Sequence, residues 1–159
     1  MHNTHTTYTI EEAKRRVERY CVYQERCHLE IERKLREMRM IPIAVDEIIA
    51  HLIQHDFLNE TRFAQAFARG KFSTKKWGKQ RIVRELKQRH ISAYNIKIAL
   101  KEISDSDYTS TFYALAEKRW TQLTSEKNLQ KKKKKFVDYM RYRGWESQKI
   151  WDVLADLQE

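Results

Sequence analysis

The sequence predicts an all-α protein in which three tandem three-helix repeats, about nine helices in all, stack into an extended, curved array. Three observations predict this fold class. Only three Gly and one Pro occur among 159 residues, too few for the tight turns that β-hairpins need. Charged residues make up 34% of the chain and hydrophobic residues 41%, a balance that suits amphipathic helices. The apolar positions of one stretch recur 54 residues later, as in stacked repeats.

The first repeat is expected to span residues 9–55, after a polar N-terminal segment, residues 1–8, that we expect to be disordered. Thr9, with Glu12 three residues later, has the form of a capping box, which marks a helix start. Pro42 interrupts the helical pattern between the second and third helices. Helices this short are marginal alone in water, so the three must pack together. The expected helices cover residues 10–25, 29–39 and 45–54.

The second repeat is expected to span residues 56–104. Asn59 and Ser92 are candidate N-caps of its first and third helices, because their side chains can accept a hydrogen bond from a free backbone N–H group. Residues 73–76 are expected to form a loop. The expected helices cover residues 60–71, 77–89 and 93–103.

The third repeat is expected to span residues 105–159. Asp107 is the candidate cap of its first helix, which carries Phe112 and Trp120 on its apolar face. Gly144 follows the second helix, at the position where a left-handed residue commonly ends a helix.

A direct comparison of the last two repeats supports this division. Six positions stay apolar under the shift, and the pairs are Ile82 and Phe136, Val83 and Val137, Leu86 and Met140, Ile91 and Trp145, Ile96 and Ile150, and Leu100 and Leu154. A hydrophobic staple, in which an apolar residue before a helix packs on one five positions later, is predicted at four helix starts. The four pairs are Leu58 and Phe63, Ile91 and Ile96, Trp145 and Ile150, and Ile43 and Ile48.

The net charge of +10 is concentrated in two blocks. Residues 71–103 carry +8 and residues 127–143 carry +7, whereas residues 1–70 are neutral. Because the blocks occupy corresponding places in two repeats, we expect a basic stripe along one side of the array that attracts a polyanion. Two solvated helix faces are the alternative interpretation. With Phe136 turned inward, the expected stripe residues are Lys75, Lys76, Lys79, Arg81, Arg84, Lys87, Arg89, Lys131, Lys134, Lys135, Arg141 and Arg143.

Trp77 has two interpretations, because it stands beside Lys75, Lys76 and Lys79. An aromatic ring in a basic groove can stack on an exposed base. A tryptophan at a helix start can equally anchor the core.

The sequence contains no motif for catalysis or for a cofactor, such as a P-loop, a Gly-rich dinucleotide turn or a zinc-protease helix. We therefore expect no enzyme activity and no cofactor. Cys27, His28, His51 and His55 do not follow a known zinc spacing, and packed or solvated histidines are expected there instead of a metal site. No apolar run is long enough to cross a membrane and no signal peptide is recognisable, which favours the cytoplasm.

The stretch FLNETRFAQAFARGKFSTKKWGKQRIVRELKQRHI, residues 57–91, resembles the RecX family, regulators of the RecA recombinase. The residues that carry the resemblance are Phe57, Leu58, Asn59, Arg62, Phe63, Ala64, Phe67, Arg69, Gly78, Arg81, Ile82, Glu85, Leu86 and Ile91. It implies a bacterial regulator in DNA repair that lies in the groove of the RecA–DNA filament and bridges neighbouring protomers. Such a protein hinders filament growth, promotes disassembly and damps the ATPase and strand exchange. Arg62, Arg69 and Trp77 then join the stripe as candidate contacts.

The resemblance also implies the partners, which are the RecA filament and, more weakly, single- or double-stranded DNA, bound by a monomer without a membrane. Two features depart from the family pattern. His90 stands where a Gly is usual, and the neutral first repeat carries an insertion around Pro42.

Two other classes of function stay open. Each repeat superficially resembles a helix-turn-helix unit, so the chain could be a sequence-independent DNA-binding protein without a RecA partner. The third possibility is a helical scaffold for another protein.

Overall fold

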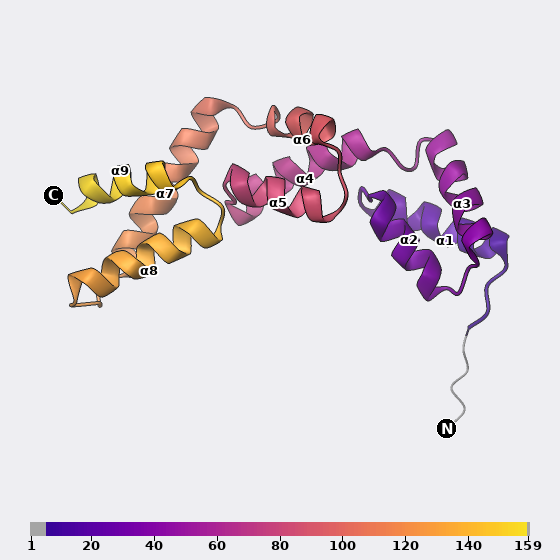
Figure 1. Cartoon of the computed structure of the whole chain (residues 1–159), viewed down its shortest axis with the longest axis horizontal. Coiled ribbons are helices and arrows are strands. Elements are labelled where there is room, and N and C mark those ends of the chain that lie inside the picture. Colours follow the sequence, from indigo (N-terminus) through magenta and orange to yellow (C-terminus); the bar gives the residue numbers. More distant parts are fainter. Residues whose placement is uncertain (1–5, 159) are drawn as a thin grey trace, which may run out of the picture.

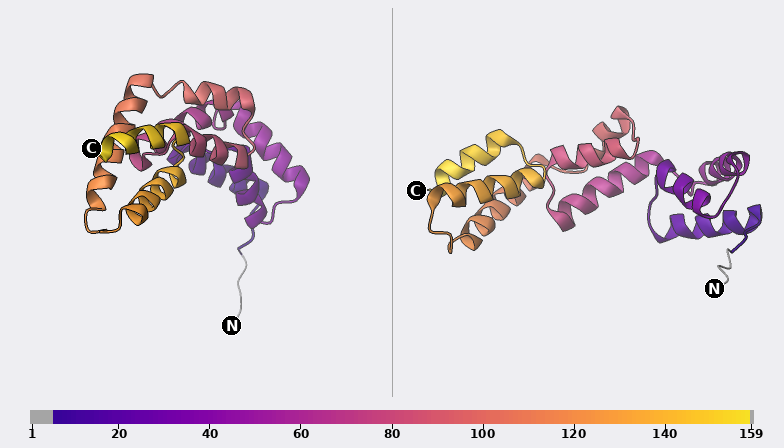
Figure 2. Two further views of the ribbon diagram at one scale, coloured as in Figure 1. Left: turned by 60° about the vertical axis from the view of Figure 1, so that its left-hand side comes forward. Right: turned by 60° about the horizontal axis from the view of Figure 1, so that its bottom comes forward.

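The computed structural model describes residues 6–158. Within this range it contains nine α-helices and no strand, which confirms the predicted fold class. Figure 1 shows that the helices form three trios, which follow one another along an elongated, curved array. The two further views in Figure 2 show the same order of trios from other sides.

We name the three trios modules 1, 2 and 3. Module 1 consists of α1 (Ile10–Tyr23), α2 (His28–Glu37) and α3 (Pro42–Gln54). Module 2 consists of α4 (Glu60–Lys75), α5 (Lys79–Gln88) and α6 (Ala93–Leu100). Module 3 consists of α7 (Asp105–Gln122), α8 (Leu129–Tyr142) and α9 (Ser147–Leu157).

Three of the four predicted caps, Thr9, Asn59 and Ser92, begin a helix as expected. The side chains of Thr9, Asn59 and Ser92 each accept a hydrogen bond from a backbone N–H group three residues later. The seventh helix differs, because Ser104 and not Asp107 is its N-cap, and the N–H group of Asp107 donates to Ser104 Oγ at 3.1 Å. Asp107 lies in the first turn of the helix, where its negative charge complements the helix dipole.

Two helix boundaries differ from the prediction. Residues 73–76 are not a loop, because α4 continues to Lys75 and ends only where Lys76 adopts a left-handed conformation with φ 57°. Pro42 follows the predicted break between α2 and α3 and begins α3 earlier than expected, since a proline in the first turn loses no helical hydrogen bond. The start at Pro42 places Ile43 inside the helix with 75% of its surface exposed, so the staple predicted between Ile43 and Ile48 is wrong.

The second helix of each module ends in the same way. Arg39, His90 and Gly144 follow these helices and have positive φ angles of 63°, 59° and 91°. The next N–H group then donates to the carbonyl of a residue five positions earlier, at 3.0, 3.1 and 3.2 Å respectively. This is the Schellman arrangement, which satisfies carbonyl groups at the end of a helix. The unusual His90 therefore occupies a backbone conformation that favours glycine.

The buried side chains form two cores. Module 1 has a core of its own, built around Val17, Leu35 and Ile48. Modules 2 and 3 share the other, and module 1 contributes the fully buried Cys27 to it. Modules 2 and 3 therefore form one packed body, to which module 1 is attached.

The expected N-terminal disorder falls partly outside the described residues, since residues 1–5 are not among them. Tyr8, at the end of that segment, packs against the core of module 1. Its hydroxyl accepts a hydrogen bond of 2.6 Å from Arg16.

Candidate functional site

The end of α8 meets the start of α5, and two backbone hydrogen bonds join them. The N–H group of Gly78 donates to Arg143 O at 2.7 Å, and that of Gln80 donates to Gly144 O at 3.1 Å. A Cβ atom on Gly78 would overlap the carbonyl group of Gly144, and one on Gly144 would overlap the backbone of Arg81. Both positions therefore require glycine for the two helices to approach this closely.

Buried aromatic side chains complete the junction. Trp145 is fully buried and donates from Nε1 to Lys76 O at 3.1 Å. The hydroxyl of Tyr108 accepts from the N–H group of Lys79 at 3.0 Å and donates to the carboxylate of Glu146, whose two oxygens both lie 2.8 Å away. Burial is the main cause that raises the pKa of Tyr108 above its ordinary value. The hydroxyl thus stays protonated and bridges modules 2 and 3.

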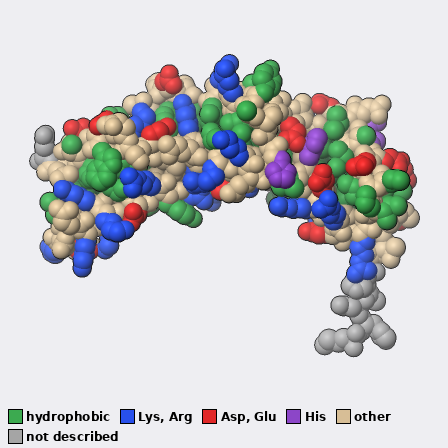
Figure 3. Space-filling model, viewed as in Figure 1, with side chains coloured by type: hydrophobic (Ala, Val, Ile, Leu, Met, Phe, Trp, Pro, Cys, Tyr) green, Lys and Arg blue, Asp and Glu red, His purple; other side chains and the backbone are tan. Residues whose placement is uncertain are grey.

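This junction places α8 and α5 one after the other along the array, as Figures 1 and 2 show. In Figure 3 Lys and Arg side chains are spread over the visible face of modules 2 and 3, and several of them gather at the lower left, over module 3. The lysine run lies at the far end of α8 from the junction, since ten residues of helix from Lys131 to Arg141 span about 15 Å. Phe136 is fully buried, as the predicted register requires, and Lys131, Lys134 and Lys135 are exposed.

The outer face of α5 carries three of the predicted stripe cations, of which Arg84 and Lys87 are exposed and Lys79 is half-buried. Lys79, Val83, Arg84 and Lys87, with two glutamines, line a shallow hollow of about 590 Å³. Among the described residues, no carboxylate pairs with Lys79, Arg84 or Lys87. Lys76, at the end of α4, is exposed, and no carboxylate of residues 6–158 pairs with it. The charge of this face is therefore free to attract an anionic or acidic partner.

Several predicted contact residues serve the fold instead. The guanidinium of Arg81 lies 4.2 Å from the ring centre of Trp77 and 4.5 Å from that of Tyr142, and it donates to Tyr142 O at 3.1 Å. Arg143 donates to Lys75 O at 2.9 Å. Both arginines thus join module 2 to module 3.

Other predicted contact residues are paired with carboxylates. Arg62 pairs with Glu25 at 2.7 Å and with Asp56 at 3.1 Å. The remaining pairs are Arg69 with Glu102 at 3.2 Å, Arg89 with Glu85 at 3.0 Å, Lys134 with Asp138 at 2.6 Å and Lys135 with Glu126 at 2.7 Å. The hydrogen bond from Lys135 holds the pKa of Glu126 below its ordinary value. These cations are partly neutralised, so they attract a partner less strongly than the outer face of α5.

Trp77 is 9% exposed, and its ring packs edge-on against Phe67 with 6.1 Å between ring centres. This position favours the core-anchor interpretation over base stacking. Tyr108 and Tyr142 lie at the junction, and the sequence did not predict this role for them. The spacing of Tyr142 and Gly144 at the end of a basic helix was the available signal, but it did not indicate what the helix end contacts.

The residues considered for a metal site lie in ordinary packing. In residues 6–158 no group of three or more potential ligands is arranged to hold a metal ion. His51 pairs with Glu18 at 2.7 Å, and its ring centre lies 4.5 Å from that of His55. Burial raises the pKa of Cys21 to about 11 and that of Cys27 to about 12, so both thiols stay protonated. None of the helices in this range combines the length and the apolar character that crossing a membrane would take.

Comparisons with known proteins agree with this architecture. The family model described as RecX, second three-helix domain, matches residues 59–100, which lie within module 2. The regulatory protein RecX of Yersinia enterocolitica is 29% identical over 118 residues, which are 74% of this chain and 68% of that protein. The regulatory protein RecX of Serratia proteamaculans is 29% identical over 126 residues, which are 79% of this chain and 72% of that protein.

Solved structures extend the match to nearly the whole chain. The crystal structure of RecX from Lactobacillus salivarius is 25% identical and superposes with a TM-score of 0.75 over 94% of this chain and 96% of that one. A second crystal structure of a regulatory protein RecX, 21% identical, shares the fold with a TM-score of 0.78 over 92% of this chain and 71% of that one. The matched module, the relatives and the shared fold show that this chain is similar to the RecX family of regulatory proteins.

Proposed function

We propose that this protein regulates the RecA recombinase in the bacterial cytoplasm. It binds as a monomer in the groove of the RecA–DNA filament, hinders filament growth and damps the ATPase and strand exchange. The observation that carries the proposal is the outer face of α5, where Lys79, Arg84 and Lys87 have no carboxylate partner among the described residues.

The rigid junction strengthens this proposal, because it keeps the cations of two modules in fixed order along the array. A filament offers repeated acidic surfaces and phosphate groups, and an elongated ligand with charge along its length can contact several of them. Each contact adds to the affinity when the spacing is held by the fold, since less freedom is lost on binding. The unpaired cations would also speed the encounter with an anionic filament.

The experiment is a RecA ATPase assay on single-stranded DNA with this protein titrated in. The test variant changes Lys76, Arg84 and Lys87 to Glu, which reverses exposed charge on the candidate surface. We expect the concentration of the variant that gives half-inhibition to be at least about tenfold higher than that of the parent, because like charges now face the filament. Arg81 is left unchanged because it joins modules 2 and 3.

The matched control changes Arg15, Lys97 and Lys101 to Glu. These residues are exposed, lie on α1, on α6 and at the end of α6, and give the same change of net charge. Inhibition equal to that of the parent is expected for the control. Equal inhibition by the test variant would disprove the assigned surface, and no inhibition by the parent would disprove the proposed function.

The second candidate function is sequence-independent DNA binding without RecA. The observation that favours it is Tyr142, which is 71% exposed and whose ring centre lies 4.5 Å from the guanidinium of Arg81. Tight binding to bare DNA that weakens steeply as salt is added would support this candidate. Weak binding to bare DNA with strong capture by RecA filaments would support the regulator.

A further inference from the structure

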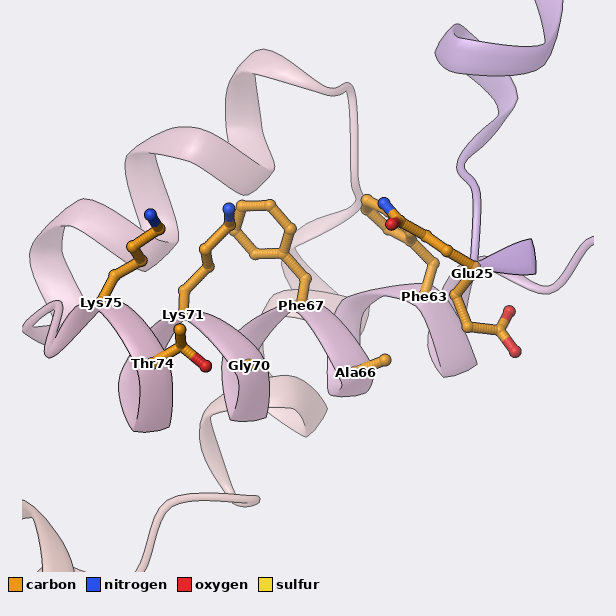
Figure 4. Close-up of a pocket in the computed structure, with 9 residues that line it drawn as sticks. Glu25, Phe63, Ala66, Phe67, Gly70, Lys71, Thr74 and Lys75 are labelled. Carbon is orange, nitrogen blue, oxygen red and sulfur yellow. The ribbon is translucent and has the colours of Figure 1, made fainter. Parts of the chain in front are cut away.

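A groove of about 420 Å³ runs along one face of α4, apart from the outer face of α5. Phe63, Ala66, Phe67 and Gly70 form its apolar part, and Lys71 and Lys75 flank one end. Figure 4 shows the row of Phe63, Phe67, Lys71 and Lys75 on one side of the helix, with Ala66 and Gly70 on the adjoining row. Phe63 and Lys75 are twelve residues apart, so the groove is about 18 Å long.

Gly70 is the unusual residue of this groove. It lies inside α4 and is exposed, and apart from its chain neighbours and the nearby backbone of its own helix no atom lies within 4 Å of where a Cβ would stand. A glycine inside a helix destabilises it relative to almost any other residue, and here no neighbour within the chain requires the small size. This differs from Gly78 and Gly144, which the fold requires. The small size at Gly70 therefore suits a close approach from outside the chain.

The aromatic ring of the groove is already covered by cations. Lys71 Nζ lies 5.5 Å from the ring centre of Phe67 and 5.2 Å from that of Trp77. The guanidinium of Arg89 lies 4.9 Å from the ring centre of Phe67. A nucleobase could stack on Phe67 only by displacing these cations, which makes a nucleic acid the poorer fit.

The charges at the two ends of the groove differ. Neither Lys71 nor Lys75 has a carboxylate partner among the described residues, whereas Glu25, at the other end, is paired with Arg62 at 2.7 Å. The lysine end therefore complements a carboxylate and the middle complements an apolar side chain.

We propose that the α4 groove binds an acidic protein segment, which places an apolar side chain over Gly70 and a carboxylate near Lys71 and Lys75. A segment of about three helical turns, or of about six extended residues, spans the length of the groove. The proposal rests on the proposed function in one respect, since it gives a RecA regulator a protein contact in addition to its charged surface.

The test variant is Gly70→Leu, which adds a bulky side chain to the groove at a position where a Cβ meets no neighbouring part of the chain. Leucine is a much better helix former than glycine, so the variant should fold and melt at the same or a higher temperature than the parent. The control is Ala155→Leu, an equally exposed change on α9. Thermal unfolding followed by circular dichroism checks that both variants fold.

The first probe contains no RecA. It is a twelve-residue model helix with leucines on one face and glutamates around them, and its partner peptide has lysines in place of the glutamates. In a titration followed by amide NMR, the glutamate peptide should shift the signals of Gly70 and Lys71 in the parent and in Ala155→Leu, with binding at least tenfold weaker in Gly70→Leu. No shift, equal shifts with the lysine peptide, or shifts of the same signals by an oligothymidylate alone would overturn the proposal.

The second probe is a RecA filament on single-stranded DNA. Gly70→Leu should bind it at least fivefold more weakly than the parent and Ala155→Leu, and equal binding would overturn the assignment of this groove to the filament contact. If the parent fails to bind the filament but still binds the glutamate peptide, the proposed function falls and the acidic-segment groove stands.

Discussion

The two junctions between modules are built differently. Modules 2 and 3 share a core and are joined by backbone hydrogen bonds at Gly78 and Gly144. Modules 1 and 2 are joined by polar side-chain contacts, in which Arg62 pairs with Glu25 and the N–H group of His28 donates to the Glu60 carboxylate. Beyond these contacts, Cys27 and the partly buried Leu29 pack into the core of modules 2 and 3.

This difference has a physical consequence for binding. Exposed ion pairs contribute about 0–1 kcal/mol each and are screened by salt, whereas interlocked backbones allow one geometry only. The two modules that carry the positive charge are therefore held in a fixed relation, while the neutral module 1 is joined more loosely. Modules 2 and 3, which carry the positive charge, are thus also the modules that are joined most firmly.

The largest predicted effect breaks the stiff junction. Gly144→Ala adds a Cβ that overlaps the backbone of Arg81 at a residue with φ 91°. We expect a loss of about 2–4 kcal/mol in the free energy of unfolding, because overpacking and a disfavoured backbone conformation add together. Urea unfolding measures it. Gly70→Ala is the matched control and should stabilise the protein by about 0.5–1 kcal/mol, because that site is open and helical; similar losses for both variants would contradict the interlocked junction.

A smaller effect is expected at the hydroxyl that bridges the same junction. Tyr108→Phe leaves the N–H group of Lys79 and the carboxylate of Glu146 without this partner, which should cost about 1–3 kcal/mol. Urea unfolding at neutral pH measures the loss, and Tyr113→Phe on the exposed side of α7 is the control. Tyr113→Phe should change the free energy of unfolding little.

The pH dependence of Tyr108 follows from the direction of its pKa shift. The folded protein raises this pKa, mainly by burial, so the folded state favours the neutral hydroxyl. The contribution of Tyr108 to stability should be complete below about pH 10, the ordinary pKa of tyrosine, and should be lost above it as the unfolded chain ionises there. Tyr108→Phe removes one titrating group, so its stability should fall less steeply with pH in that range, and a parallel fall in both proteins would contradict the assignment.

The looser junction should respond to salt. Arg62→Met removes the pairs with Glu25 and Asp56, and because about a third of the arginine side chain is exposed, we expect a loss of only about 0.5–1 kcal/mol. The loss should shrink as sodium chloride is raised, since screening already weakens the pairs in the parent. Small-angle scattering should show a broader range of overall lengths for Arg62→Met than for the parent at low salt. A loss that does not depend on salt would mean that Arg62 acts through packing.

The sequence predicted the parts of the fold that depend on near neighbours. Caps such as Asn59 and Ser92 and the left-handed Gly144 are local signals, and the structure has them where the sequence indicates. The contact between Gly78 and Gly144 was not predictable, because it joins positions 66 residues apart and depends on how two modules pack. For the same reason the sequence showed Arg81 only as a cation and not as a donor to a carbonyl of module 3.

The smallest effect concerns His90, the residue that departs from the family pattern. Its φ of 59° lies in the left-handed region. This backbone conformation costs a residue with a β-carbon about 1–2 kcal/mol and costs a glycine almost nothing. The greater freedom of glycine in the unfolded chain offsets part of this gain. We therefore expect His90→Gly to stabilise the protein by about 0.5–1 kcal/mol, measured by thermal unfolding. Arg39→Gly, at the equivalent end of α2, should give a similar gain within module 1. If His90→Gly destabilises the protein while Arg39→Gly stabilises it, the His90 imidazole makes a favourable contact that outweighs the backbone strain. The two helix ends would then share a backbone conformation but not the same side-chain energetics.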